Sequence, residues 1–299
     1  MDGHDELDGR GTTRRTALTG LAGAAGGVAL ALASGWADGA AAAAGVRPPR
    51  LADVRTADPA AVRARYARRR PARWGEHLPG ILSALPVTHV LRGGRRRPVA
   101  ALTFDACGNP RSGSSGYDRA LVETLRRHHV PATLFLSGRW IAKNPAVAAD
   151  LAADPLFEIG NHGTRHVPLS VTGRAAYGIR GTRDAAAAVA EVWGNTLGLE
   201  AVSGHRPRLF RCGTALYDDV GVAICRSLGQ RPVAYTVNAD AGASLPAREV
   251  ARQLHGLRPG GISIGHVNHP ERWTAEGLAR ALPGLLDAGW VFVRIGDVV

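Results

Sequence analysis

The stretch Val99-Ala100-Ala101-Leu102-Thr103-Phe104-Asp105 decides the fold: it is a short apolar run that ends abruptly at a carboxylate. Runs of this length and composition are typical of strands that are buried on both faces of a parallel sheet. Similar runs recur toward the end of the chain with longer amphipathic stretches between them, and this alternation predicts parallel strands joined by helices. The expected strands are 99–104, 132–136, 157–160, 209–211, 233–237, 262–265 and 291–295.

The intervening stretches predict helices, several of which have a glycine near one end, where the chain must reverse. They cover residues 117–128, 144–153, 182–199, 218–228, 246–257 and 274–288. Seven strands alternating with six helices favour an α/β fold of the distorted (β/α) barrel type, with about seven parallel strands. In such barrels the functional side chains stand at the C-terminal ends of the strands.

Composition supports a folded domain, because 45% of the 299 residues are hydrophobic and only 21% are charged. The net charge of +12 is concentrated in an arginine-rich stretch over residues 47–97. This stretch has few interleaved aromatic residues, which argues against a nucleic-acid partner. We interpret residues 45–97 as a linker or cap, and an anionic wall polymer remains the alternative partner for its charge.

The N-terminus has the layout of a twin-arginine export signal. Arg14 and Arg15 precede an uncharged run rich in alanine, glycine and leucine over residues 16–37, and the alanine tract 40–44 offers small-residue cleavage sites. The run is long enough to span a bilayer but weakly hydrophobic, which favours cleavage over stable membrane insertion. We therefore expect a signal over 1–44, the linker or cap over 45–97 and the main domain over 98–299, secreted or in the cell wall.

Polar residues follow the expected strands. Asp105 ends the first one, and a carboxylate there can take a proton from water or hold a cation. His162 and His166 are four residues apart, so one helical turn would bring both imidazoles to a Zn²⁺ ion. Arg211 follows another strand and could orient a carboxylate through paired hydrogen bonds.

Two further strand ends run into polar residues, Asp240 in one case and His266 in the other. In this order, the five segments resemble the polysaccharide deacetylase family with the NodB homology domain, which is carbohydrate esterase family 4-like. The resemblance covers roughly residues 98–299. It implies a NodB-like barrel and a hydrolase that removes acetyl groups from an extracellular polysaccharide.

The resemblance also implies a role for each matching residue. Asp105 would be the catalytic base and His266 the general acid, with Arg211 orienting the base and Asp240 tuning the acid. His162 and His166 would bind a divalent metal, with Asp105 beside them. Two imidazoles with oxygen donors suit Zn²⁺ best, and Co²⁺, Ni²⁺ and Fe²⁺ are alternatives.

The first motif departs from the family, because the aspartate that supplies the third protein ligand is replaced by Ala106, followed by Cys107. Three outcomes are open: a two-histidine site completed by water or Asp105, a compensating ligand, or loss of metal and activity. The candidate compensating ligands are Asp118, His269 and Cys107.

The chain has three cysteines, so at most one intramolecular disulfide can form, and a bridge between Cys107 and Cys212 is one possibility. The candidates for lining a substrate groove lie close to His266 in the sequence: Trp273, Asn268 and His269. We expect a monomer acting on an acetylated chitin- or peptidoglycan-like glycan. The alternatives are an O-acetyl (xylan-type) esterase and an inactive glycan-binding protein on the same fold.

Overall fold

The computed structural model describes residues 58–108 and 115–299, which belong to one compact unit of the chain. The export signal predicted over residues 1–44 lies outside the described residues, as does the first part of the predicted linker, 45–57. Within the described part of the chain, none of the helices combines the length and the hydrophobicity needed to span a membrane.

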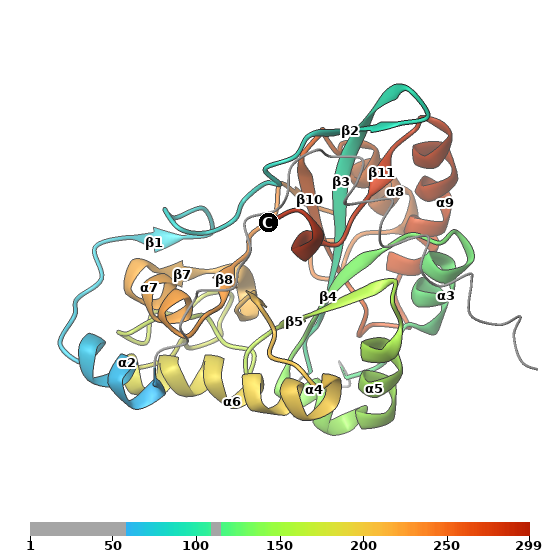
Figure 1. Cartoon of the computed structure of the whole chain (residues 1–299). Helices are drawn as coiled ribbons and strands as arrows, with labels where there is room; N and C mark the ends of the chain where they lie inside the picture. The colour runs from blue at the N-terminus through green and yellow to red at the C-terminus, as the bar shows by residue number, and fades with distance from the viewer. Residues whose placement is uncertain (1–57, 109–114) are drawn as a thin grey trace, which may run out of the picture. The chain divides into compact units, whose positions relative to one another are not determined.

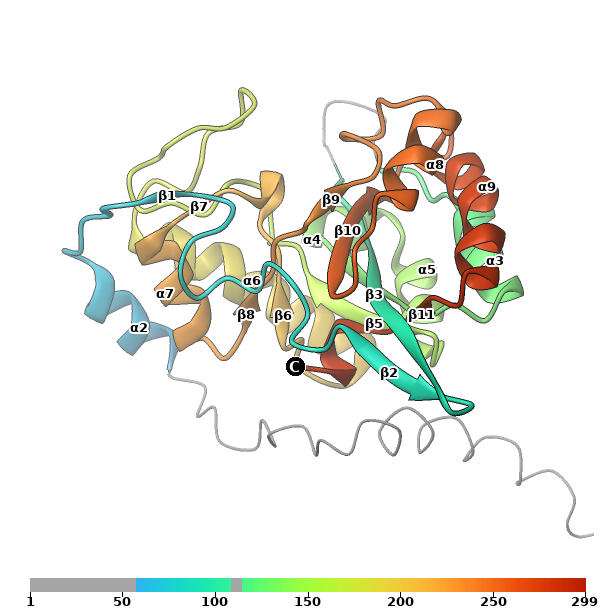
Figure 2. The same ribbon diagram turned by 90° about the horizontal axis from the view of Figure 1, so that it is seen from above.

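The central feature is a mostly parallel sheet in the order β8-β6-β5-β4-β3-β10-β9 (Figures 1 and 2). All neighbours along this path pair in parallel, and β11 also pairs in parallel with β3. This curled half-barrel confirms the predicted α/β barrel-like fold. The strands are β1 (Trp74–Gly75), β2 (His89–Arg92), β3 (Arg95–Ala106), β4 (Ala132–Leu136), β5 (Phe157–Asn161), β6 (Leu209–Phe210), β7 (Tyr217–Asp218), β8 (Arg231–Pro232), β9 (Val237–Asn238), β10 (Gly261–His266) and β11 (Val291–Phe292).

Helices cover the sheet in two groups, and in both views α8 and α9 lie on the side opposite to α2 and α7. Helices α3, α8 and α9 pack on one another beside β3 and β10, and α2, α5 and α7 pack around the long helix α6. The helices are α2 (Pro59–Tyr66), α3 (Arg119–Arg127), α4 (Gly138–Lys143), α5 (Pro145–Ala153), α6 (Ala185–Ser203), α7 (Asp219–Ser227), α8 (Ala247–His255) and α9 (Thr274–Asp287).

Strand β3 shows how the sequence positions the site. Its alternate residues Leu102 and Phe104 belong to the core cluster that includes residues of α3, α8 and α9, whereas Val99 and Ala101 belong to a separate core cluster with residues of β4 and β10. Because side chains alternate along a strand, Asp105 lies on the same face as Val99 and Ala101. The carboxylate therefore faces away from the helices, at the C-terminal edge of the sheet.

The N-terminal part of the described chain contains more structure than the sequence predicted. Strand β2 pairs antiparallel with the first residues of β3, and Gly93 and Gly94 form the two-residue connection with φ values of 58° and 72°. Two positive φ angles are what a tight hairpin turn of this kind requires. The arginines of this hairpin hide its strand character, because exposed strand positions carry no apolar signal.

Other differences concern short elements. The predicted strand 233–237 is replaced by β8 and β9, and only residue 237 of it lies in a strand. Helix α4 was not predicted: it is a single short helix whose N-cap Ser137 accepts a hydrogen bond from the Trp140 N–H. The remaining predicted strands and helices are confirmed, with ends displaced by a few residues.

Candidate active site

The candidate catalytic residues gather because parallel strands end at one edge of the sheet. Asp105 in β3 is the direct neighbour of His266, the last residue of β10. His162 and Arg211 follow β5 and β6 immediately, and Asp240 follows β9 by two residues. The rule that such strand ends carry function therefore correctly predicted that these residues would meet.

Asp105 and Arg211 form a buried ion pair. Arg211 Nη1 donates to Asp105 Oδ1 at 2.8 Å and to Thr103 Oγ1 at 2.8 Å, while Nη2 donates to the Ala234 carbonyl at 3.1 Å. Both side chains are almost fully buried, and the guanidinium lies over the Phe135 ring, with Cζ 4.3 Å from the ring centroid. These contacts fix the position of the carboxylate.

His162 has its tautomer set by the backbone. Its Nδ1 lies 2.7 Å from the Arg211 carbonyl oxygen, which can only accept, so Nδ1 carries the hydrogen. The other nitrogen, Nε2, faces Asp105 Oδ2 at 3.4 Å and Cys107 Sγ at 3.8 Å. Burial alone would lower the pKa of His162, but Asp105 and Cys107 raise it above its usual value. The surroundings of Nε2 thus favour a positive charge at that point.

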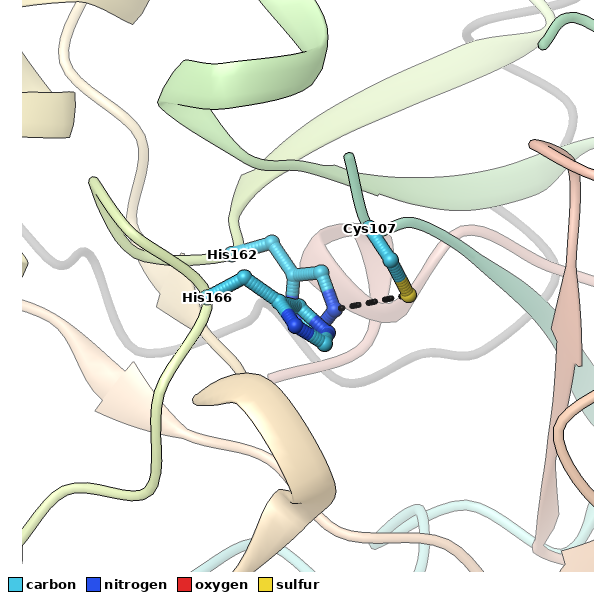
Figure 3. Close-up of side chains that lie close together, drawn as sticks. All are labelled: Cys107, His162 and His166. Carbon is cyan, nitrogen blue, oxygen red and sulfur yellow. Dashed lines mark hydrogen bonds between the residues drawn. The ribbon is translucent and has the colours of Figure 1, made fainter. Parts of the chain in front are cut away.

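His166 completes a compact group with His162 and Cys107, shown in Figure 3. The two imidazole rings meet edge to face with centroids 4.6 Å apart. One ligand atom from each of the three residues lies within 4.8 Å of the other two. Among residues 58–108 and 115–299, this is the group of side chains close enough to share a metal ion, and Asp105 is not a member of it.

The prediction of a helical turn between His162 and His166 is wrong. Gly163 and His166 both have positive φ, 78° and 59°, so the segment is a loop that turns back on itself. The buried carboxylate of Glu191, in α6, accepts hydrogen bonds from the N–H groups of Arg165 at 3.0 Å and Val167 at 3.3 Å. The two rings therefore converge through this loop and its anchor, by a route that the four-residue spacing does not reveal.

The segment that follows Arg211 packs directly against this loop. A Cβ added at Gly213 would lie 2.4 Å from the His166 carbonyl carbon and 2.5 Å from its oxygen. Backbone atoms cannot move aside cheaply, so glycine is required at position 213. Sequence reasoning missed this contact and Glu191, because nothing local in the sequence links either residue to His166.

Asp240 and His266 form a second acid–base pair. Asp240 Oδ1 lies 2.9 Å from His266 Nδ1, and Oδ2 accepts from the His266 N–H at 2.7 Å and from Thr274 Oγ1 at 2.9 Å. Burial alone would lower the pKa of His266, but Asp240 and Cys107 raise it well above its usual value. Asp240, by contrast, has a lowered pKa: burial opposes ionisation, and His266 more than offsets it.

The Cys107 thiol lies among these imidazoles. Burial would raise its pKa, but His166 and His266 more than offset this effect and lower the pKa well below the usual value. A thiolate with two imidazole nitrogens is a donor set that suits Zn²⁺. The residues present therefore fit a bound divalent metal.

The other alternative ligands are engaged elsewhere. Asp118 caps α3, where its Oδ1 accepts from the Leu121 N–H at 3.1 Å, and His269 Nδ1 lies 2.9 Å from Glu271 Oε1. The possible Cys107–Cys212 bridge does not form: all three cysteines are free, and Cys212 Sγ points to the Leu216 carbonyl at 3.1 Å.

The three predicted substrate contacts differ in exposure. Trp273 is 51% exposed at the start of α9, and His269 is half-buried with its ring 6.5 Å from that of His266. Asn268 is fully buried, so any effect it has on a substrate would pass through its neighbours. The contribution of these residues to binding stays a prediction.

A family model described as polysaccharide deacetylase matches residues 92–233. This segment is of the polysaccharide deacetylase type. The matched segment contains Asp105, His162, His166 and Arg211. Asp240 and His266 lie beyond it.

Two curated proteins are similar to this chain. The chain is 24% identical over 222 residues to the uncharacterized protein YlxY of Bacillus subtilis, covering 73% of this chain and 62% of the relative. It is 26% identical over 215 residues to a chitooligosaccharide deacetylase of Sinorhizobium fredii, covering 68% of this chain and 92% of the relative. The chain thus spans less than two thirds of the first relative's length.

A similar solved structure is that of BA3943 from Bacillus anthracis, described as a family 4 carbohydrate esterase pseudoenzyme. Its TM-score is 0.55 at 22% identity, with 67% of this chain and 64% of that chain covered. A mutant of the same protein is described as having restored enzymatic activity. This likeness shows that the two proteins share a fold.

Proposed function

We propose that this protein is a metal-dependent hydrolase that removes N-acetyl groups from an extracellular chitin- or peptidoglycan-like glycan. The observation that carries the proposal is the pairing of Asp105 with His266 across neighbouring strands, each side chain held by an oppositely charged partner. A carboxylate that can act as a base and an imidazole that can act as an acid are the two groups that amide hydrolysis needs.

Asp105 would act as the base. Arg211, which also donates to Thr103, holds its position, so the carboxylate can accept a proton from the attacking water. Its second oxygen, Oδ2, faces His162 and is not engaged by Arg211. The base is therefore fixed at one oxygen and available at the other.

His266 would act as the acid that protonates the leaving nitrogen. Its Nδ1 is engaged by Asp240, which leaves Nε2 as the nitrogen that can deliver a proton. Because Asp240 helps to keep the pKa of His266 high, the imidazolium persists at neutral pH. Protonation of the amine makes it a competent leaving group.

His162 and His166 would hold the divalent metal, with Asp105 beside them and Zn²⁺ as the preferred ion. A bound ion of this kind supplies Lewis-acid polarisation of the acetyl carbonyl and of the attacking water. Twin-arginine export, with the substrate in the cell wall, completes the proposal.

A second candidate function is glycan binding without catalysis. Ala106 at the position of the family's metal-ligating aspartate favours it, because a methyl group cannot coordinate an ion. The structural neighbour described as a pseudoenzyme belongs to the same fold. The two candidates differ in acetate release, which only the enzyme produces.

Acetate release tests the proposal. The zinc-loaded protein is incubated with N-acetylated chitooligosaccharides, peptidoglycan and acetylated xylan, alongside the variants Asp105→Asn and Asp287→Asn. We expect release from an N-acetyl substrate, a loss of about 100- to 10,000-fold in Asp105→Asn, and no change in Asp287→Asn, whose side chain is exposed. Release from xylan alone would favour the O-acetyl esterase, and no release from any substrate would favour glycan binding.

A further inference from the structure

We propose that Cys107 is a thiolate ligand of the metal, so that a sulfur and two imidazole nitrogens hold the ion where the family has an aspartate and two histidines. The inference rests on the proposed metal site but needs no catalytic activity. It explains how the chain tolerates the alanine at position 106.

Alternation along β3 decides which residue can replace the missing aspartate. Ala106 is fully buried and belongs to the core cluster that includes residues of α3 and α9. The next residue, Cys107, emerges on the same side as Asp105 because side chains alternate with a period of two. A thiol at position 107 thus faces the site, and the residue at 106 does not.

The donor distances match those around a single ion. With bonds of about 2.3 Å to sulfur and about 2.05 Å to nitrogen, two donors at a tetrahedral angle on zinc lie about 3.6 Å apart. Cys107 Sγ lies 3.8 Å from His162 Nε2, and the three ligand atoms are all within 4.8 Å of one another. Small rotations of the side chains bring all three into coordination distance.

The His162 ring is already oriented for coordination. Its Nδ1–H is held by the Arg211 carbonyl, so the lone pair on Nε2 is directed toward Cys107 and Asp105. Metal-bound histidines characteristically donate their second ring N–H to a carbonyl or carboxylate in this way. Nε2 lies 3.8 Å from Cys107 Sγ and 3.4 Å from Asp105 Oδ2, so an ion placed here would be close to all three atoms.

The backbone holds Cys107 in place on both sides. Its carbonyl accepts a hydrogen bond from Ser137 Oγ, the side chain that also caps α4. Gly108 has φ 67°, and a Cβ there would lie 2.6 Å from the Trp140 backbone nitrogen, so the chain passes very close to α4. A thiol fixed in this way loses little conformational freedom when it binds an ion.

Sulfur ligation makes two predictions about selectivity. A thiolate favours Zn²⁺ and Co²⁺ over Mn²⁺ and Mg²⁺, which prefer oxygen donors. Cys107 is also the half-buried cysteine of the three, while Cys212 and Cys225 have no exposed surface. A bound ion should therefore protect one reactive thiol from alkylation.

Cobalt binding tests the ligand directly. Co²⁺ is added to metal-free wild type, Cys107→Ala and Cys225→Ala, and the near-ultraviolet thiolate-to-cobalt band is recorded after circular dichroism has verified folding. We expect the band in wild type and Cys225→Ala and its loss in Cys107→Ala. Outer-shell changes alone reduce metal affinity about 10- to 100-fold, so Cys107→Ala should reduce zinc affinity by at least that factor.

Alkylation with iodoacetamide gives a second readout. Saturating zinc should slow modification of Cys107, located by peptide mass, at least about tenfold. An undiminished cobalt band in Cys107→Ala, or alkylation at the same rate with and without zinc, would overturn the inference. So would an acetyl thioester on Cys107 of metal-free protein after turnover, because the thiol would then be a nucleophile.

The outcomes separate this inference from the proposed function. A cobalt band without acetate release sinks the hydrolase and leaves the thiolate ligand standing. Chelator-sensitive acetate release with no thiolate band leaves the hydrolase standing and sinks the ligand.

Discussion

At the scale of single residues, the site depends on charges that compensate one another while buried. Arg211 has no exposed side-chain surface, and only 4% of the Asp105 side chain is exposed. Water therefore cannot solvate either charge if its partner is lost. Removing one partner of a buried pair is costly because the other charge is left unpaired. We therefore expect the pair to contribute to stability as well as to the proposed catalysis.

This argument predicts that Arg211→Ala lowers the free energy of unfolding by about 3–5 kcal/mol. Asp105→Asn in the same chain should recover part of that loss, since the amide is neutral. Urea unfolding of the two single variants and the double variant measures the coupling. Strictly additive effects would show that the two side chains do not compensate each other.

Asp240 sets the protonation of His266 and therefore the alkaline limit of activity. The raised pKa of His266 means that its imidazolium persists to higher pH than in an ordinary histidine. Asp240→Asn removes the charge that favours the imidazolium, so the alkaline limb of kcat/KM should move to lower pH. An alkaline limb at the wild-type pH would contradict His266 as the acid.

Sequence reasoning reached these residues because each stands at a strand end with a recognisable partner type. It did not select Cys107 over Asp118 or His269, which the sequence left equally open. That choice depends on which face of β3 the thiol occupies and on where His166 turns back, and both depend on tertiary contacts.

At the scale of elements, the loop from His162 to His166 depends on α6. Glu191 has no exposed side-chain surface and holds two backbone N–H groups of the loop as well as Arg165 Nε at 3.3 Å. A Cβ at Gly163 would lie 2.5 Å from Glu191 Oε1, so carboxylate and loop are in direct contact. Helix α6 therefore supports the loop that carries His166, one of the proposed metal ligands.

We expect Glu191→Ala to weaken zinc affinity about 10- to 100-fold, because His166 loses its fixed position. Asp184→Ala is the matched control: it removes the N-cap of the same helix, whose Oδ1 accepts from the Ala187 N–H at 2.7 Å. This control should cost about 1 kcal/mol of stability and leave zinc affinity unchanged. Competition with a chromophoric chelator measures both, and equal affinities in the two variants would refute the support role.

Strand and helix prediction succeeded where apolar periodicity was strong, as in β4, α8 and α9. It failed over residues 233–237, because most of this apolar run connects β8 and β9, the two edge strands of the sheet. Apolar character alone does not reveal which residues pair. It also missed the Gly93-Gly94 hairpin, whose arginine-rich strands lack an apolar face.

At the scale of the whole molecule, the fold brings together residues from five distant segments by one rule, the common edge of parallel strands. That rule is topological and could be applied before any coordinates were known. The detailed ligand set is not topological, since it depends on loops that follow the strands. The fold and the pairing of Asp105 with Arg211 and of Asp240 with His266 were therefore predictable, and the position of Cys107 beside the two histidines was not.

Export concerns the chain as a whole. We expect protein recovered from the culture medium to begin close to the alanine tract 40–44, because cleavage follows small residues at the end of a signal. N-terminal sequencing of the secreted protein measures this. Replacing Arg14 and Arg15 by lysine should reduce secretion, and secretion of protein with an intact N-terminus would contradict a cleaved signal.

The central claim is that one cation is shared by Cys107, His162 and His166 at the edge of the sheet. Anomalous scattering at the zinc edge from a crystal of the zinc-loaded protein tests it most directly. The account predicts one peak about 2.3 Å from Cys107 Sγ and about 2.1 Å from a nitrogen of each histidine. A peak outside this group, or none at full zinc occupancy in solution, would contradict it.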